Sequence, residues 1–506
     1  APLEEVIRPR LHLVFSGYRI DRVHGFRLTR DSDLPIDDDE AEDLLSLVRM
    51  GLVQRRTGAS VSLRVDAAMP ASMVNELCQR LNIARGDVFK IDGLQHLKQL
   101  FELTDLPGFE HLRNDPLPPQ PKPNLPLEED IFETVADHDA LVHHPYHTFE
   151  PVEQFVARAA DDPQVLAIKQ TLYRTTSESP IMASLVRAAE SGKQVTALIE
   201  LRARFDEENN IHWARRLEQA GAHVIYGLAG LKVHCKACLV IRREREGIRR
   251  YVHLATGNYN EKTAKLYTDI GLLTSDDDMC QDISALFNVI TGYSQQPRWN
   301  LIEIAPTGMR RRLMSTIERE TELSSKATPG RIVAKLNSLE DREIIDALYR
   351  ASQSGVHIEL MIRGLCCLRP GVKGLSENIR VVSVIDRFLE HSRIVYFQNG
   401  GREEVYLASA DWRPRNFDRR IELMFPVLDP VAMAACKEAL RVGLSDNVRG
   451  WELCSDGTWQ RVKPGRGDEV IRSQLELHQR AVERAKKPRP TTESVFTPIT
   501  REPAGR

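Results

Sequence analysis

The central part of the chain alternates short apolar runs with segments whose hydrophobic residues recur at helical spacing. Residues 180–191 and 211–220 show the helical spacing, and each is followed by a glycine that would end a helix. Residues 195–201 and 223–226 are apolar runs of strand length. Strands that alternate with helices usually form a parallel or mixed sheet with helices on its faces, so we predict an α/β fold with mixed α+β character.

The same order of elements recurs further along the chain. Residues 331–336 and 357–363 are predicted strands, and residues 342–353 are a predicted helix. The segment LYRASQSGVHIELMIR, from Leu348, matches LVRAAESGKQVTALIE, from Leu185, in its helix face, its Ser-Gly stop and its strand. We therefore predict a duplicated domain with a site at the pseudo-twofold interface, although two unrelated units of this kind can also look alike.

The composition changes before and after the repeated region. A proline-rich stretch, residues 116–126, is typical of a linker, and the residues before it carry helical patterns. The end of the chain is rich in Pro, Thr and Arg, which is typical of disorder. The predicted parts are residues 1–120, 121–301, 302–486 and a disordered tail, 487–506.

Composition limits the classes of function. The chain has 506 residues, 42% of them hydrophobic, without an apolar run long enough to span a membrane. The first ten residues do not resemble a signal peptide, so we expect a cytoplasmic protein. The formal net charge of −3 argues against a nucleic-acid partner, and phosphate binding would need locally grouped Arg and Lys.

The strongest chemical signal lies in GLKVHCKACLV, residues 230–240. Alternate residues of a strand face the same side, so His234 and Lys236 should project together. A neutral imidazole can attack phosphorus while a neighbouring cation stabilises the charge on the phosphate oxygens. Alone, however, this pair is a weak signal.

The second copy provides a matching pair, His391 and Arg393, in EHSRIVYF. In both copies a further strand ends in small polar residues, LATGNYN and LASADW, at similar spacing from the histidine. This layout resembles the H-x-K pattern of the phospholipase D superfamily. The aspartate of that pattern is replaced by Ile241 and Gln398 here, which argues against an ordinary phospholipase or nuclease.

Longer motifs carry a closer resemblance, to the histidine-phosphorylated polyphosphate kinase family over roughly residues 1–486. The matching runs are HHPYHTFEPV, KQTLYRT, ELRARFDEENNIHWARRLEQAGAHVIYG, GLKVHCK, ATGNYNEKTAKLYTD, IRGLC, DRFLEHSR, YLASADW and RRIEL. The resemblance implies two phospholipase D-like domains, residues 121–301 and 302–486. Residues 1–120 resemble the latter part of the family's mainly helical middle domain, and we find no counterpart of its N-terminal domain.

The resemblance also implies roles for individual residues. His234 would be the phosphorylated nucleophile, and His391 would bind nucleotide and assist in acid–base catalysis. Tyr267 and Arg363 match ATP contacts, with a core tyrosine and a surface ion pair as the alternatives.

Arg174 and Arg204 match positions that the family associates with Mg²⁺, the implied cofactor. Because an arginine has no lone pair to offer a cation, we interpret both as clamps on phosphate oxygens. A salt bridge with Asp206 or Glu207 is the alternative for these arginines.

Three carboxylates, Asp269, Glu390 and Glu422, are candidates to orient the histidines through one imidazole nitrogen. The sequence does not choose among them. His143, His144 and His147 lack the further ligands that a metal site needs.

The expected function is reversible transfer of the ATP γ-phosphate to inorganic polyphosphate through a phosphohistidine. The resemblance implies ATP, ADP and polyphosphate as partners and a homo-oligomer, a dimer or tetramer; peripheral membrane association stays open. Two alternatives remain, a phospholipase D-like phosphodiesterase and a non-catalytic protein that binds polyphosphate.

Overall fold

The computed structural model describes residues 2–31, 58–201, 203, 206–228, 230–292 and 297–487. These residues belong to two compact units, Ala1–Pro116 and Leu117–Arg506, which are described separately. Arg204 and the predicted tail beyond Lys487 lie outside the described residues.

The first unit combines helices with a small sheet. Strand β2 (Ser60–Asp66) lies between β1 (Phe26–Arg30), which is antiparallel to it, and β3 (Val88–Ile91), which is parallel. Helix α4 (Ala71–Leu81) contributes Val74 and Cys78 to a small core with residues of β2. The other helical segments are α1 (Leu3–Ile7), η1 (Arg8–Arg10), α2 (Leu11–Val14), η2 (Arg85–Asp87), η3 (Leu97–Asp105) and η4 (Glu110–Leu112).

The second unit begins with a mixed sheet in the order β16-β11-β10-β9-β5-β6-β7, with β4 beside β11. Strands β5, β6 and β7 are parallel to one another, whereas β9, β10 and β11 follow as antiparallel neighbours. The strands are β4 (Ala140–His144), β5 (Val165–Leu172), β6 (Gln194–Ile199), β7 (His223–Tyr226), β9 (Ala237–Glu244), β10 (Gly247–Ala255) and β11 (Tyr267–Thr274).

The other half of this unit repeats that arrangement in the order β12-β19-β18-β17-β13-β14-β15-β20-β21. Its strands β13, β14 and β15 are parallel, and β17, β18 and β19 are antiparallel, as in the first half. The strands are β12 (Glu303–Ala305), β13 (Arg331–Leu336), β14 (His357–Ile362), β15 (Ile379–Val384), β17 (Ile394–Phe397), β18 (Glu404–Ala408), β19 (Arg420–Pro426), β20 (Gly450–Leu453) and β21 (Trp459–Arg461). The matching strand orders confirm the predicted duplication.

Local sequence explains why the same helix recurs in both halves. Ser179 caps the start of helix α7 (Pro180–Glu190) and Asp341 caps the start of α12 (Arg342–Gln353), and each of these side chains accepts a backbone N–H of the first turn. Both helices are followed by a Ser-Gly pair whose glycine has a positive φ, 83° at Gly192 and 89° at Gly355. The predicted helices at these positions are therefore confirmed.

Helices cover both sheets. Helix α7 packs on β6 between α6 (Glu150–Asp161) and α8 (Glu207–Gln219), and α11 (Met309–Leu323) packs with α12 on the second sheet. Helices α10 (Asp277–Ile290) and α14 (Pro430–Leu444) contribute to a core that both sheets share. The remaining helical segments of this unit are α5 (Ile131–Asp137), α9 (Glu261–Ala264), η5 (Asn399–Gly401), α13 (Pro414–Asp418) and α15 (Ser473–Lys486).

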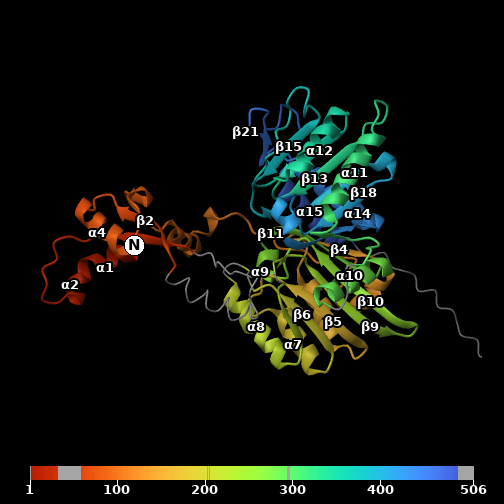
Figure 1. The fold of residues 1–506 in the computed structure, drawn as a ribbon, viewed down its shortest axis with the longest axis horizontal. Helices are drawn as coiled ribbons and strands as arrows, with labels where there is room; N and C mark the ends of the chain where they lie inside the picture. Colours follow the sequence, from red (N-terminus) through yellow and green to blue (C-terminus); the bar gives the residue numbers. More distant parts are fainter. Residues whose placement is uncertain are drawn as a thin grey trace, which may run out of the picture. The chain divides into compact units, whose positions relative to one another are not determined.

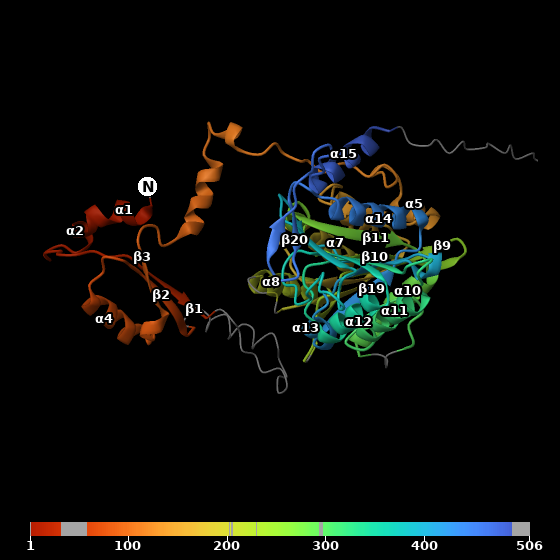
Figure 2. The ribbon, with the colours of Figure 1, turned by 90° about the horizontal axis from the view of Figure 1, so that it is seen from above.

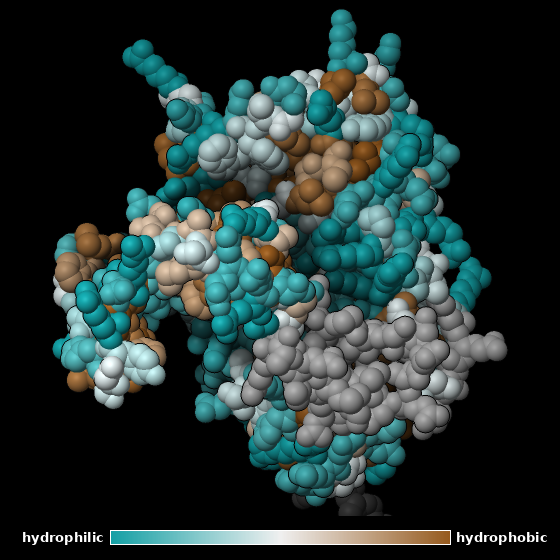
Figure 3. All heavy atoms as spheres, turned by 60° about the vertical axis from the view of Figure 1, so that its left-hand side comes forward, coloured by the Kyte–Doolittle hydropathy of each residue, from teal (hydrophilic) through white to brown (hydrophobic). Residues whose placement is uncertain are grey.

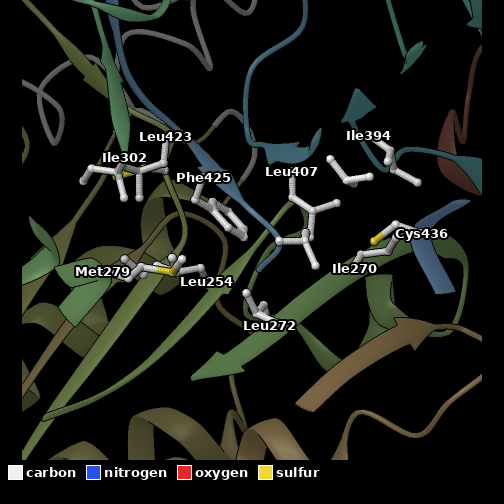
Figure 4. Close-up of a cluster of buried hydrophobic side chains, with 14 of the residues drawn as sticks. Leu254, Ile270, Leu272, Met279, Ile302, Ile394, Leu407, Leu423, Phe425 and Cys436 are labelled. Carbon is white, nitrogen blue, oxygen red and sulfur yellow. The ribbon is translucent and has the colours of Figure 1, made fainter. Parts of the chain in front are cut away.

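The shared core joins the two halves into one body. Leu254, Ile270 and Leu272 of the first half lie in one buried cluster with Leu407 and Phe425 of the second (Figure 4). Figures 1 and 2 show the second half, coloured green to blue, packed against the first, coloured orange to green. Burial of this cluster is a major stabilising term for the unit, since apolar burial drives folding.

Each half also gives a short strand to the sheet of the other. Strand β8 (Lys232–Val233) of the first half pairs in parallel with β19 of the second half. Strand β16 (Leu389–Glu390) of the second half pairs in parallel with β11 of the first half. Because these strands directly precede His234 and His391, the exchange brings both histidines to the boundary between the halves.

Most residues on the surface seen in Figure 3 are hydrophilic, and smaller patches of hydrophobic residues lie between them. Within the described ranges, no helix combines the length and the apolar character needed to cross a bilayer.

Candidate active site

His234 is held by the backbone and by a carboxylate of the other half. The backbone N–H groups of His234 and Cys235 both donate to the carbonyl oxygen of Ile421, at 3.0 and 2.9 Å. Nδ1 of His234 lies 2.9 Å from Oε2 of Glu422, which is fully buried. A carboxylate that accepts Nδ1–H leaves the lone pair on Nε2, the nitrogen that could attack phosphorus.

The charges around His234 favour a neutral imidazole beside an ionised carboxylate. Burial lowers the pKa of His234 to about 3; Glu422 opposes this shift, and Lys236 reinforces it. Burial alone would raise the pKa of Glu422, but His234, Lys236 and Arg420 outweigh it and lower that pKa to about 2. At neutral pH the histidine is therefore uncharged and available as a nucleophile.

Lys236 shares the polar side of this segment, as its spacing from His234 predicts. Its ammonium group donates to the carbonyl oxygen of His234 and lies 5.4 Å from the centre of the Tyr173 ring. Val233 and Cys235 face the opposite way, into the shared core. Burial lowers the pKa of Lys236 to about 7, although Glu422 acts in the opposite direction.

His391 has an equivalent environment built from the opposite halves. Its Nδ1 lies 2.9 and 2.8 Å from the two carboxylate oxygens of Asp269. Its backbone N–H donates to the hydroxyl of Thr268 at 3.1 Å. Arg393 lies 3.2 Å from Nε2 of His391 and also pairs with Asp411 at 3.2 Å. Burial and Arg393 lower the pKa of His391, against the effect of Asp269.

A hydroxyl group donates a hydrogen bond to each of the carboxylates that contact the histidines. Ser409 donates to Oε2 of Glu422 and accepts the backbone N–H of Leu423 at 3.0 Å. Thr256 donates to Oδ1 of Asp269 at 2.7 Å and accepts the backbone N–H of Ile270, also at 3.0 Å. The two histidines thus have matched, reciprocal supports, in which each carboxylate belongs to the other half.

The polar groups around His234 and those around His391 belong to one polar centre. The carbonyl oxygen of Lys236 accepts the backbone N–H of Ala255 at 3.1 Å. The next residue, Thr256, contacts Asp269 through its hydroxyl and Arg393 through its carbonyl oxygen, at 3.3 Å. Lys236 and Arg393 are close enough that Arg393 contributes to the lowered pKa of Lys236. The described residues therefore bring both H-x-K/R pairs together.

Tyr267 and Arg363 lie on the His391 side of this centre. The Tyr267 ring is 5.3 Å from the His391 ring, and its side chain is only partly buried. Nε of Arg363 donates to Asn337 at 2.9 Å, and Asn337 in turn donates to the carbonyl oxygen of His391 at 3.1 Å. These positions suit contacts with a ligand at His391 and do not match the core alternative for Tyr267.

Arg174 lies on the His234 side. It follows β5, and its Nε is 3.4 Å from Asp206, so the salt bridge considered as an alternative is present. Its guanidinium also lies 5.8 Å from the Tyr173 ring, which packs edge-on against His234 at 5.0 Å. Arg174 could still contact a phosphate, because about a third of its side chain is exposed.

The carboxylates of the site do not form a metal-binding cluster. Among the described residues, no group of three or more His, Cys, Asp or Glu side chains is arranged to hold a metal ion. Glu422 and Asp269 instead bind imidazoles. This donor set fits a divalent ion that arrives on the phosphates of a substrate rather than one held by the protein alone.

Of the three candidate carboxylates, Glu422 contacts His234 and Asp269 contacts His391. Glu390 pairs with Lys335 instead of an imidazole, and its carboxylate lies 2.6 Å from the ammonium group of that lysine. Sequence reasoning did not assign roles to Thr256 and Ser409, although both occupy the same place in LATGN and LASAD. The matching positions of Thr256 and Ser409 in the two copies are the sequence signal that could have identified both residues.

The duplicated sheets, with one histidine from each half in a shared polar centre, define a class of α/β protein with one composite site between two similar domains. The comparisons with known proteins give the family. Residues 1–103 match the polyphosphate kinase middle domain, residues 130–296 its C-terminal domain 1 and residues 302–474 its C-terminal domain 2.

Individual relatives agree. A polyphosphate kinase from Synechocystis sp. is 49% identical over 491 residues, covering 94% of this chain and 67% of the relative. One from Rhodopirellula baltica is 46% identical over 496 residues, covering 98% and 58%. The crystal structure of polyphosphate kinase from Porphyromonas gingivalis, 32% identical, superimposes with a TM-score of 0.81 over 96% of this chain and 70% of that one.

The chain belongs to the polyphosphate kinase family, a family of ATP–polyphosphate phosphotransferases, as its motifs predicted. It spans about three fifths to two thirds of the length of the two relatives named above.

Proposed function

We propose that this chain transfers the γ-phosphate of ATP reversibly to inorganic polyphosphate, through a phosphorylated His234. The observation that carries the proposal is the 2.9 Å contact between Nδ1 of His234 and the buried carboxylate of Glu422, which leaves Nε2 as the nitrogen that can attack. The lowered pKa values of both groups agree with a neutral imidazole beside an ionised carboxylate. The family membership supports the same substrates.

In the first step, Nε2 of His234 attacks the γ-phosphorus. The N–P bond forms as the bond to the β–γ bridging oxygen breaks, and ADP leaves with that oxygen. The imidazole keeps its proton on Nδ1, where Glu422 stabilises the new positive charge. Lys236 and Arg393 stabilise the charge on the transferring phosphate oxygens.

In the second step, a terminal oxygen of polyphosphate attacks the same phosphorus. The N–P bond breaks, its electron pair returns to Nε2, and the polymer grows by one phosphate. Since no proton needs to leave Nδ1, the reverse sequence can make ATP from polyphosphate with the same groups.

His391 would serve the nucleotide. Its ring is fixed by Asp269 and lies beside Arg393 and Tyr267, so it could contact the departing ADP phosphates. Arg363, whose Nε donates to Asn337 beside His391, would add a further contact with ATP.

Mg²⁺ would enter with the substrate as Mg–ATP and neutralise phosphate charge. Arg174, together with Arg204, would clamp the phosphate oxygens that carry the ion, since a guanidinium cannot bind a cation directly.

The proposal is tested by incubating the purified chain with Mg–ATP and a short polyphosphate primer and measuring polymer length on gels. We expect longer polyphosphate and ADP, and the reverse reaction with excess ADP. Polyphosphate binding without either reaction would support the non-catalytic alternative, and hydrolysis of phosphodiesters without ATP would support the phosphodiesterase.

We also propose that the chain forms homo-oligomers. Several large hydrophobic side chains of the first unit are strongly exposed, among them Leu13, Val14, Tyr18, Phe101 and Leu112. Exposed apolar side chains of this kind are available for contacts between copies of the chain. Light scattering after size exclusion should give a mass above that of one chain.

A further inference from the structure

The two histidines differ in the residue that precedes each of them in the chain. His234 is preceded by Val233, a buried residue of the shared hydrophobic core. His391 is preceded by Glu390, whose carboxylate is also buried, with 6% of the side chain exposed. By strand register, the position of Lys335 in the second half corresponds to Thr171 in the first. The second half therefore buries an ion pair where the first half has none.

The buried ion pair is tied to the backbone of His391. Glu390 accepts from Lys335 at 2.6 Å and from the hydroxyl of Thr268 at 3.0 Å. The same Thr268 oxygen accepts from Lys335 and from the backbone N–H of His391, each at 3.1 Å. A buried ion pair is stable only when its remaining polar atoms are also satisfied, so a further partner of Glu390 matters to this arrangement.

That further partner is Gln474, at the start of helix α15. Its Nε2 donates to Oε1 of Glu390 at 2.7 Å and to the carbonyl oxygen of Phe388 at 2.8 Å. Its Oε1 accepts the backbone N–H of Phe388, also at 2.8 Å. The side-chain amide thus binds both backbone groups of Phe388, as a neighbouring strand would, and none of the residue is exposed.

Neighbouring residues hold the start of α15 in place. Arg472 pairs with Asp386 at 2.6 Å, four residues before Glu390. Ser473 donates to Asp446 through its backbone N–H and its hydroxyl, at 2.7 Å each. The residues at the start of α15 therefore bind residues 386–390, the segment that directly precedes His391.

We propose that Gln474 is a positioning residue for His391. Its hydrogen bonds hold β16 in place and complete the hydrogen bonding of the Glu390 carboxylate. Glu390 in turn accepts from Thr268, which accepts the backbone N–H of His391, so Gln474 fixes the position of the His391 backbone relative to Asp269. The catalytic consequence rests on the proposed role of His391 in phosphate transfer, whereas the positioning itself is a property of the fold. His234 has no equivalent attachment to α15 among the contacts that the structure describes, so the effect should be confined to one histidine.

The test uses Gln474→Met, which keeps the length of the side chain and removes its three hydrogen bonds. The full chain is treated with diethyl pyrocarbonate, and the modification of each histidine is followed by peptide mass spectrometry. His234 is the internal reference, because its side chain is 12% exposed and that of His391 is 15% exposed. Gln479→Leu, an exposed position on the same helix, is the matched control.

We expect Gln474→Met to raise the modification rate of His391 by about fivefold or more through local opening of β16, with His234 unchanged. The control should change neither rate. An unchanged His391 rate, or an equal rise at both histidines, would overturn the proposal, since the latter indicates general loosening.

Activity gives the second readout. If the chain elongates polyphosphate, Gln474→Met should lower kcat by about tenfold or more, with KM for polyphosphate changed by less than about twofold. If neither the parent nor the variant has activity but His391 alone becomes reactive, the positioning stands and the proposed function fails. Normal parental activity with unchanged His391 reactivity rejects the positioning alone.

Should Gln474→Met not fold, Gln474→Glu keeps the length and one acceptor but loses the donors to Phe388 and Glu390, and the same rise at His391 is expected. Hydrogen exchange of residues 386–392 in the parent chain is a check that needs no variant. Slow exchange supports the attachment, and exchange as fast as that of an exposed loop contradicts it.

Discussion

At the scale of single residues, the site is a pair of imidazole–carboxylate contacts with unequal cationic neighbours. Glu422 and Asp269 hold Nδ1 of His234 and His391 in the same way. Both cations are buried, but Lys236 has a pKa near 7, whereas Arg393 is paired with Asp411 and permanently charged. Protonation of Lys236 is therefore the part of the proposed phosphate site that changes near neutral pH.

The first prediction concerns the orientation of His234. Glu422→Gln should reduce kcat by about 100-fold or more, because the amide no longer stabilises the positive charge that forms on the ring. Steady-state ATP consumption measures the effect. Glu218→Gln, at an exposed position on α8, is the control. A change of less than threefold at Glu422 would argue against its role.

The second prediction follows from the pKa of Lys236, which burial lowers to about 7. The value of kcat/KM reports the free enzyme, so it should fall as pH rises through about 7 and Lys236 loses its proton. Protonation of His234, with a pKa of about 3, should not limit the rate between pH 5 and 7. Lys236→Arg should move the alkaline limb to far higher pH; an unmoved limb would assign it to another group.

At the scale of elements, local signals determine much of the fold. The Ser-Gly stops and the apolar runs identified α7, α12 and their neighbouring strands, because caps and burial patterns are properties of a few adjacent residues. The exchange of β8 and β16 could not be predicted. Both are two-residue strands whose partners lie far away in sequence, and their pairing depends on how the two halves pack.

The site shows the same division between local and distant information. The face shared by His234 and Lys236 followed from strand alternation, and the candidate carboxylates included both that contact the rings. Choosing between Glu390 and Glu422 required the tertiary fold, since Glu422 is 188 residues from His234. The role of Gln474 also had no local signal, because its partners precede it by more than 80 residues.

The third prediction tests an element of the shared core. Asp429 caps helix α14, and its side chain accepts the backbone N–H of Ala432 at 2.7 Å. Asp429→Ala should lower the free energy of unfolding by about 1 kcal/mol, whereas Asp429→Asn, which can also cap, should stay within a few tenths. Urea unfolding measures both. Equal losses in the two variants would show that the charge, not the cap, matters.

At the scale of the whole molecule, the two catalytic halves behave as one body. Their sheets exchange strands, their histidines exchange carboxylates, and residues of both halves fill one hydrophobic core (Figure 4). Neither half can complete its own site, since the carboxylate of each histidine belongs to the other half.

The fourth prediction follows from that dependence. Residues 117–301 produced alone should expose the core residues of α10 and β9–β11 and bind a hydrophobic dye such as ANS. Residues 117–487 should give one cooperative transition by calorimetry. A stable, dye-free first half would show that the halves fold independently.

The most direct test of the whole account is the position of the phosphate on the enzyme. The chain is incubated with ATP labelled in the γ-phosphate, and the label is located by peptide mass spectrometry under alkaline conditions that preserve phosphohistidine. We predict an acid-labile phosphate on His234, lost in His234→Ala and retained in His223→Ala, an exposed histidine. Undiminished acid-labile labelling in His234→Ala would contradict the account.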